Sequence, residues 1–362
     1  FSFTSILEGR KRKQQLDINS EIEESVGYKV SEQVFSFSSS IRQLIKLAIL
    51  NFKNVVKEIP FVAIVFCGVV LLFTTASVLD GIYGTSIYPV TYALLEQTSG
   101  SFALFVIIII TFYSGELVWQ ERRLNMNLIY DALPVPNWLL LASKTLALTF
   151  VLILLMGIVM FASILIQLFN GFTDIDFALY INELFYLKLY GYILVSILAI
   201  LIQTLVREKF LGHLIMVVYF IMNIVMGQVG LEHNLYQYNG KPGYIYSEIN
   251  KYGHLLEGVN WMNLYWGSFA LLLALVSNLF WQRGTETGFK WKLKIAGSRF
   301  NSSAKIVTSL GLIAFVALGS FIFYNTNVLN TYRTKKEGEK LAAAYEKNYK
   351  KYEGIPQPKV TA

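Results

Sequence analysis

Long apolar stretches alternate with short polar segments along most of this chain. Seven stretches carry few or no charges: Ile59–Leu79, Phe102–Val118, Leu146–Phe169, Leu189–Val206, Phe210–Val229, Met262–Trp281 and Ile306–Tyr324. An apolar stretch of about 20 residues spans a bilayer core of roughly 30 Å as a helix, because lipid offers the backbone no hydrogen-bond partners and a helix satisfies its own. The pattern predicts an all-α, polytopic membrane helix bundle with about seven transmembrane helices.

Composition supports this class and excludes some sites. Of the 362 residues, 54% are hydrophobic and only 15% are charged, a balance that soluble globular chains rarely reach. Cys67 is the only cysteine, so an intramolecular disulfide or a cysteine-based metal cluster is excluded. The chain starts with Phe rather than Met and ends on IPQPKVTA, which has the composition of an extended linker. We expect it to be a fragment of a longer protein.

The distribution of Lys and Arg predicts the topology, because these residues accumulate in cytoplasmic loops. With the N-terminus inside, the inside loops hold eleven of them: Arg122, Arg123, Lys144, Arg207, Lys209, Arg283, Lys290, Lys292, Lys294, Arg299 and Lys305. The outside loops hold three: Lys188, Lys241 and Lys251. We therefore expect a cytoplasmic N-terminus and an outside C-terminus.

The segments around the predicted spans divide the chain into five parts. Residues 1–40 are expected to be a flexible cytoplasmic linker, 41–58 an amphipathic interfacial helix, 59–324 the transmembrane domain, 325–354 an outside stalk helix, and 355–362 a linker to a missing domain. In the amphipathic helix, Arg42, Lys46, Lys53 and Lys57 fall in one narrow sector and apolar residues fill the rest. This suits a helix on the inner membrane surface; the alternative is a helix packed on a soluble domain. Residues 81–100 are expected to be an outside loop with a short helix.

Residues 114–138, SGELVWQERRLNMNLIYDALPVPNW, place charges directly after a very apolar run. Met126, Ile129, Tyr130 and Leu133 recur at spacings of three and four, which predicts a short amphipathic helix ending before Pro134. Arg122 and Arg123 could reach lipid phosphates and pair with Glu121. A rigid surface helix between two spans can transmit force from a cytoplasmic partner to the membrane.

This segment resembles the elbow between the second and third spans of type-2 ABC exporter permeases. It is most similar to the branch fused to an outside aminopeptidase N-like zinc metallopeptidase, as are REKFLGH, QRGTETGFK and the NTNVLN to YEGIPQP stalk. The resemblance implies that Gly115, Glu116, Trp119, Glu121, Arg122, Asp131, Pro134 and Pro136 occupy elbow positions, and we add Arg123 to this coupling elbow. One departure is that such permeases have six spans per half, whereas we count seven here.

The resemblance implies a location in a bacterial cytoplasmic (inner) membrane. The implied partners are the lipid bilayer, a separate cytoplasmic ABC ATPase, and a second permease half or a second copy. No G-x-x-x-x-G-K-[ST] phosphate loop occurs, so ATP would be held by the partner subunit. No H-E-x-x-H occurs either, so no cofactor is expected in this chain and zinc would belong to the absent domain. The net charge of +7 comes from inside loops, and we expect no nucleic-acid partner.

Several polar residues within the spans leave alternatives open. Gln203 and Asn223 are expected to hydrogen-bond between helices, because an unpaired amide in hydrocarbon is costly; lining a substrate path is the alternative. Glu116 could take part in gating or pair with Arg122, or it could simply reach water, and Lys144 is expected to reach the membrane surface.

The sequence therefore favours the permease subunit of an ABC-type exporter. The alternative is a membrane anchor that displays an outside metallopeptidase domain. Intramembrane proteolysis would need paired Asp, Ser/His or metal-ligand motifs within spans, and these are missing, so we do not expect this chain to be an enzyme.

Overall fold

Helices make up nearly all of the regular structure in the computed structural model, which describes residues 36–77, 88–284 and 288–355. The predicted linkers, residues 1–40 and 355–362, lie mostly outside the described residues, and residues 37–40 of the first already belong to a helix. In chain order the helices are α2 Phe37–Val56, α3 Ile59–Ser77, α4 Thr91–Arg123, α5 Asn127–Ala132, α6 Asn137–Phe169, α7 Phe177–Tyr180, η2 Ile181–Lys188, α8 Leu189–Leu205, α9 Lys209–Val229, α10 Leu255–Phe280, α11 Phe289–Arg299, α12 Ser302–Phe323, η3 Tyr324–Leu329, α13 Lys335–Tyr349 and η4 Lys350–Tyr352. An isolated bridge between Ser247 and Lys251 is the one β contact within this part of the chain.

The helix lengths confirm an all-α membrane fold. Six continuous helical segments are long and apolar enough to cross a membrane: Thr91–Arg123, Asn137–Phe169, Phe177–Leu205, Lys209–Val229, Leu255–Phe280 and Ser302–Leu329. A seventh candidate is a bent pair, Phe37–Val56 and Ile59–Thr75, which meet at 68°. The described residues thus contain six to seven candidate spans, in agreement with the seven apolar stretches of the sequence.

The buried core lies where α4, α6 and α8 meet. Val106 and Ile109 of α4, Leu148 and Leu152 of α6, and Ala199 of α8 are fully buried in one hydrophobic cluster. A second cluster joins α10 to α12. Half of the apolar window of α4 is buried within the protein, against 11% for α9 and for α12. In a membrane, the large apolar surface left on α9 and α12 would face lipid or another protein rather than water.

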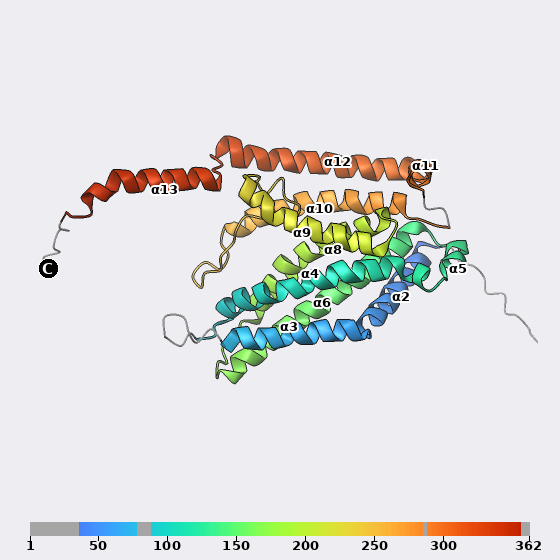
Figure 1. Cartoon of the computed structure of the whole chain (residues 1–362), viewed down its shortest axis with the longest axis horizontal. Coiled ribbons are helices and arrows are strands. Elements are labelled where there is room, and N and C mark those ends of the chain that lie inside the picture. Colours follow the sequence, from blue (N-terminus) through green and yellow to red (C-terminus); the bar gives the residue numbers. More distant parts are fainter. Residues whose placement is uncertain (1–35, 78–87, 285–287, 356–362) are drawn as a thin grey trace, which may run out of the picture. The chain divides into compact units, whose positions relative to one another are not determined.

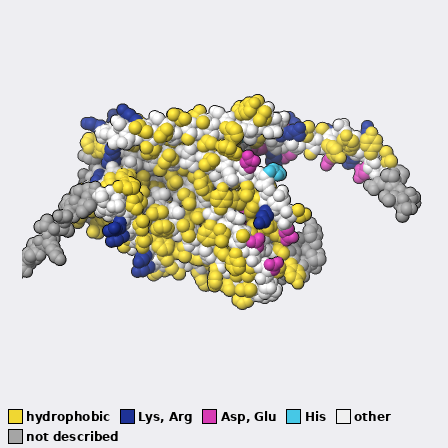
Figure 2. Space-filling model, turned by 180° about the vertical axis from the view of Figure 1, so that it is seen from behind, with side chains coloured by type: hydrophobic (Ala, Val, Ile, Leu, Met, Phe, Trp, Pro, Cys, Tyr) yellow, Lys and Arg dark blue, Asp and Glu magenta, His cyan; other side chains and the backbone are white. Residues whose placement is uncertain are grey.

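The bundle has two distinct ends (Figure 1). At one end, here called the elbow end, α5 joins α4 to α6 and α11 precedes α12. At the other, the loop end, lie the residue 231–254 segment and the start of α13. On the face in Figure 2, Lys and Arg side chains gather toward the elbow end and Asp and Glu side chains toward the loop end, with apolar side chains between them.

Two helices extend beyond the predicted spans because polar residues continue them. Residues 91–100, expected to belong to an outside loop with a short helix, form the first turns of α4. Their polar side chains have partners in other helices: Gln97 donates to the Thr75 carbonyl over 2.8 Å, and Ser163 of α6 donates to the Thr98 hydroxyl over 3.2 Å. Likewise α6 begins at Asn137 rather than at the predicted Leu146. Lys144, in the second turn of this helix, is buried within the protein instead of reaching the membrane surface.

The two flanking helices exist, and their membrane placement stays a prediction. Arg42, Lys46 and Lys53 lie on α2, and Lys57 directly follows it. The predicted stalk forms α13, which begins with a complete capping box: the Thr334 hydroxyl accepts from the Glu337 backbone N–H, and the Glu337 carboxylate accepts from the Thr334 N–H. An 11-residue helix, α11, that the hydropathy pattern did not predict precedes α12.

Candidate functional site at the elbow between α4 and α6

The elbow is a short helix between a tight turn and an extended, proline-containing segment. After α4 ends, Asn125 adopts φ of 53°, a left-handed conformation that Asn tolerates better than most residues. The Met126 N–H then donates back to the Glu121 carbonyl over 2.9 Å and closes the turn. On the other side of α5, Pro134 and Pro136 keep the chain extended, and Pro136 is the N-cap residue of α6. The predicted short helix is present as α5.

Two contacts fasten the elbow to the segment that follows α10. The Asp131 carboxylate accepts from the Gly284 backbone N–H over 2.7 Å, and the Arg283 guanidinium donates to the Val135 carbonyl. Asp131 is on α5 and Val135 precedes α6, so both ends of the elbow are tied to the same short segment. Movement of α5 would therefore also displace the end of α10.

The outer surface of the elbow is apolar and uncovered. α5 has no buried residue, and Leu128 and Ile129 are 60% and 65% exposed. Leu124, Met126 and Leu133 add to this surface. Exposed apolar side chains grouped on one short helix indicate a surface that is covered by a partner protein or by the membrane interface.

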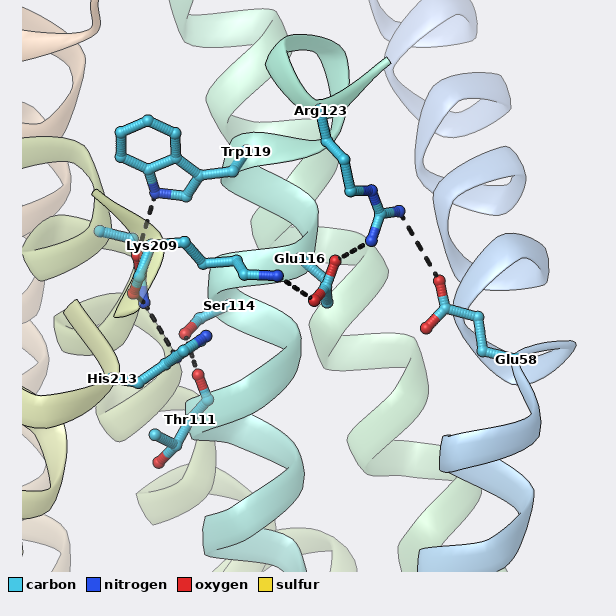
Figure 3. Close-up of polar contacts among 9 residues, drawn as sticks. Glu58, Thr111, Ser114, Glu116, Trp119, Arg123, Lys209 and His213 are labelled. Carbon is cyan, nitrogen blue, oxygen red and sulfur yellow. Dashed lines mark hydrogen bonds and ion pairs between the residues drawn. The ribbon is translucent and has the colours of Figure 1, made fainter. Parts of the chain in front are cut away.

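Glu116 is the centre of an ion-pair cluster next to the elbow (Figure 3). Its carboxylate is 8% exposed and accepts from Lys209 at the start of α9 over 2.6 Å and from Arg123 in the last turn of α4. The Arg123 guanidinium also lies 4.0 Å from Glu58, between α2 and α3. One buried carboxylate thus connects α4 to α9, and Arg123 extends the connection to the α2–α3 bend. From the sequence, pairing with Arg122 was one of three alternatives for Glu116, and the partners observed are Lys209 and Arg123.

A chain of polar side chains runs beside this cluster. The indole N–H of Trp119 donates to Gln203 Oε1 over 3.0 Å, and Gln203 Nε2 lies 3.1 Å from His213 Nδ1. The imidazole stacks on Phe112 at a centroid distance of 5.9 Å and faces the Thr111 carbonyl (Figure 3). Gln203 therefore hydrogen-bonds from α8 to both α4 and α9, which is the interhelical role expected for it. Asn223 instead donates to the Tyr219 carbonyl of its own helix.

Two glycines allow α4, α8 and α9 to approach one another closely at this polar chain. A Cβ built on Gly115 would overlap the imidazole of His213, and one built on Gly212 would overlap the Gln203 amide. Glycine at both positions leaves the space that the polar chain occupies. The resemblance placed Gly115 at the elbow, whereas it included Gly212 within REKFLGH without giving this glycine a role.

Glu121 and Lys144 form a second ion pair between α4 and α6. Lys144 is 2% exposed; its ammonium donates to Glu121 over 2.6 Å and to the Leu117 carbonyl, and lies 5.9 Å from the centre of the Trp281 ring. Glu121 is therefore paired with Lys144, not with Arg122 or Arg123 as expected from the sequence. Arg122 lies over the ring of Trp119 at 5.1 Å.

Most of this site falls inside a segment that a protein-family model matches. Residues 56–223 match the family model described as ABC-2 family transporter protein. This segment is an ABC-2 family transporter membrane domain. It extends from the last residue of α2 into α9, so that the elbow, Glu116 and Gln203 all belong to it. No curated protein and no solved structure matches the chain. The narrower resemblance, to the branch fused to an aminopeptidase, finds no support in these comparisons.

The described part of the ABC-2 domain and its flanks offers no evident metal centre. Among residues 36–77, 88–284 and 288–355, no group of three or more His, Cys, Asp or Glu side chains is arranged to hold a metal ion. Domains of this family are typically not catalytic themselves. The polar residues described above instead connect helices to one another.

Basic residues from the chain that follows the ABC-2 domain cover the ends of two helices. The ammonium of Lys292, on α11, donates to the carbonyls of Thr204, Leu205 and Val206 at 3.1 to 3.2 Å. Arg299 donates to the carbonyls of Leu279 and Trp281 at the end of α10. Positive charge at a helix C-terminus satisfies orphan carbonyls and complements the helix dipole. α11 thus fixes the last turns of α8 and α10 at the elbow end.

A pH effect on stability follows from Lys292. Burial, together with the nearby charges of Arg122 and Arg207, lowers the pKa of Lys292 from 10.5 to about 8. Between these two values the unfolded chain binds more protons than the folded chain, so the contribution of Lys292 to the free energy of unfolding rises with pH; below pH 8 both states are protonated. We expect the melting temperature in detergent to rise less between about pH 7.5 and 9.5 in Lys292→Met than in the unaltered chain. Lys241, whose pKa is also lowered to about 8, still contributes a rise in the variant. Equal pH slopes in the two proteins would contradict the assignment.

Proposed function

We propose that the chain is the membrane permease subunit of an ABC-type exporter, driven by a separate cytoplasmic ATPase that docks on the elbow. The observation that carries the proposal is the exposed apolar surface of α5 within an ABC-2 transporter domain. The 362 residues contain no phosphate-binding loop, so the energy for transport would come from a partner. The excess of basic residues toward the elbow end supports a cytoplasmic location for the elbow.

The contacts around the elbow explain how docking would reach the spans. α5 continues into α4 and α6 through short turns, and Asp131 ties it to the segment after α10. Within α4, the carboxylate of Glu116 then connects to Lys209 of α9. A displacement of α5 would therefore be passed to four helices by direct contacts, two through the chain itself and two through polar side chains. A second permease half or a second copy would complete the transporter.

Crosslinking from Leu128 tests the docking surface directly. A photoreactive amino acid at this exposed position should form a crosslinked product in the native host, and mass spectrometry of that product should find peptides of an ATPase with a G-x-x-x-x-G-K-[ST] loop. The matched control is Ile249, which is 98% exposed and lies at the loop end. Absence of the ATPase from the Leu128 product, or equal yield from both positions, would contradict the proposal.

Leu128→Asp is expected to weaken the association without unfolding the permease. The side chain touches no core, so stability should change little, whereas a carboxylate in an apolar contact should lower ATPase recovery at least tenfold, about 1.4 kcal/mol. The measurement is the ATPase-to-permease ratio after affinity purification, with Ile249→Asp as control. Unchanged recovery together with full cellular function would favour the alternative of a membrane anchor.

A further inference from the structure

A second polar site lies at the loop end, opposite the elbow. A cavity of about 450 Å³ opens between α4, η2 and the loop of residues 241–252. α4 contributes Glu96 and Ser99 to its wall, η2 contributes Glu183 and Lys188, and the loop contributes Lys241 and Tyr252. A volume of this size is within the range of small-molecule sites. Figure 2 shows acidic and basic side chains close together at the loop end of an otherwise largely apolar face.

The π-helix η2 brings two of these charges onto one side. In an α-helix, residues five apart point about 140° away from one another. The wider turn of a π-helix closes i to i+5 hydrogen bonds, as the Leu189 N–H to Leu184 carbonyl contact shows here. Glu183 and Lys188, five residues apart, therefore face the same cavity and pair at 3.5 Å. Single π-helical turns inside α-helices are found frequently at functional sites.

Glu183 is fully satisfied within the protein. Its carboxylate accepts from the hydroxyls of Tyr252 at 2.6 Å and Tyr244 at 3.2 Å, besides the pair with Lys188. The Lys188 ammonium also lies over the ring of Tyr244 at 5.6 Å. The charges of Glu183 and Lys188 therefore compensate one another, and both residues are part of the cavity wall.

Two further charged groups in the cavity form no ion pair within the described residues. The Lys241 ammonium donates to the Leu187 carbonyl over 3.1 Å and lies over the Tyr190 ring, and no carboxylate of residues 36–77, 88–284 or 288–355 forms an ion pair with it. Glu96 is exposed to the cavity and its carboxylate has no hydrogen bond or ion pair within the same ranges. The cavity thus presents one available cation and one available anion.

The wall near Glu96 is also aromatic and open. Tyr92, one turn before Glu96 on α4, stacks on Tyr246 with ring centroids 5.7 Å apart. Gly100, one turn after it, leaves free space, since a Cβ there would meet no atom within 4 Å. Tyrosine rings beside a carboxylate attract an ammonium group through cation–π and Coulomb interactions.

We propose that this cavity binds a small zwitterionic ligand, whose ammonium group lies at Glu96 and Tyr92 and whose phosphate or carboxylate group lies at Lys241. A ligand of this class compensates both available charges at once, whereas a simple cation or anion compensates only one of them. The shared chemistry fits a free zwitterion such as phosphoethanolamine or the headgroup of a zwitterionic lipid. The site is separate from the elbow and does not depend on ATPase docking.

Titration of purified full-length chain in detergent tests the proposal. The probes are phosphoethanolamine, inorganic phosphate and ethanolamine, and calorimetry should find one site with a clear preference for phosphoethanolamine. Glu96→Gln and Lys241→Gln should each weaken phosphoethanolamine binding about tenfold. Glu96→Gln should bind phosphoethanolamine and phosphate equally, and Lys241→Gln should bind phosphoethanolamine and ethanolamine equally. Glu257→Gln and Lys251→Gln, exposed residues at the same end that do not line the cavity, should bind like the unaltered chain.

The pH dependence and the lipid environment refine the result. Burial and the neighbouring charge of Lys188 lower the pKa of Lys241 to about 8, while Glu183 opposes the shift, so binding should weaken as pH rises above 8. In nanodiscs, phosphatidylethanolamine should compete with the free probe if the ligand is a lipid headgroup, and phosphatidylglycerol should not; equal binding in both lipids would assign the site to a free zwitterion. Absence of phosphoethanolamine binding, or equal binding by Glu96→Gln, Lys241→Gln and the control variants, would overturn the proposal.

Discussion

Gly115→Ala is expected to destabilise the helix bundle, although it adds a single methyl group. The new Cβ would overlap the imidazole of His213 and lie 3.0 Å from Gln203 Nε2. Neither group moves freely, because His213 stacks on Phe112 and Gln203 is bound by Trp119. Overpacking of this kind costs about 1–3 kcal/mol and exceeds the gain of up to about 1 kcal/mol that alanine brings to a helix interior. The measurement is the melting temperature of the purified chain in detergent.

Gly157→Ala is the matched control. Gly157 also lies within a long membrane helix, α6, but a Cβ built on it would meet no atom within 4 Å. There the helix propensity acts alone, so we expect an unchanged or slightly higher melting temperature. If both variants melted at the same temperature, the close approach of α4 to α9 at His213 would be wrong.

Glu116→Gln is expected to cost about 2–3 kcal/mol, because a buried carboxylate that serves two cations is lost. Lys209, whose side chain is 22% exposed, would lose its charge partner at the start of α9. Arg123 is 49% exposed and still lies near Glu58, so part of its charge would be solvated, and this keeps the cost below that of a fully buried pair. A lower melting temperature in detergent is the expected result.

A double-mutant cycle separates the ion pair from general damage. Lys209→Met in the Glu116→Gln background should cost less than Lys209→Met alone, because its partner is already absent. Glu257→Gln, an exposed acidic residue of α10, should melt like the unaltered chain. Strict additivity of the two changes would contradict a direct interaction between Glu116 and Lys209.

Hydropathy predicted the parts of the fold that consist of long apolar helices. Six of the seven apolar stretches coincide with straight candidate spans, because lipid exposure makes long apolar helices obligatory. The first stretch became part of a bent pair with α2. Hydropathy failed where polar residues are buried: it excluded residues 91–101 from α4, although Gln97 and Thr98 have partners in other helices.

Only part of the candidate site could be predicted from the sequence. Spacing predicted α5, and the resemblance pointed to Gly115, Glu116 and Trp119. Their partners Lys209 and His213 lie some 90 residues further on, and helical periodicity carries no information about which residues of different helices meet. The π-helical turn at Glu183 was missed for a related reason, since its sequence reads equally well as an α-helix.

The hairpin of α4 and α6 is longer than a bilayer is thick. Each helix has 33 residues, which corresponds to about 50 Å, whereas the hydrocarbon core measures roughly 30 Å. The pair must therefore project from the membrane or tilt within it. Rigid tilting about the bilayer midplane would swing the two ends of the hairpin in opposite directions by similar amounts. An inward push on α5 would then shift the first turns of α4, where Glu96 lines the cavity, without any change in the length of either helix.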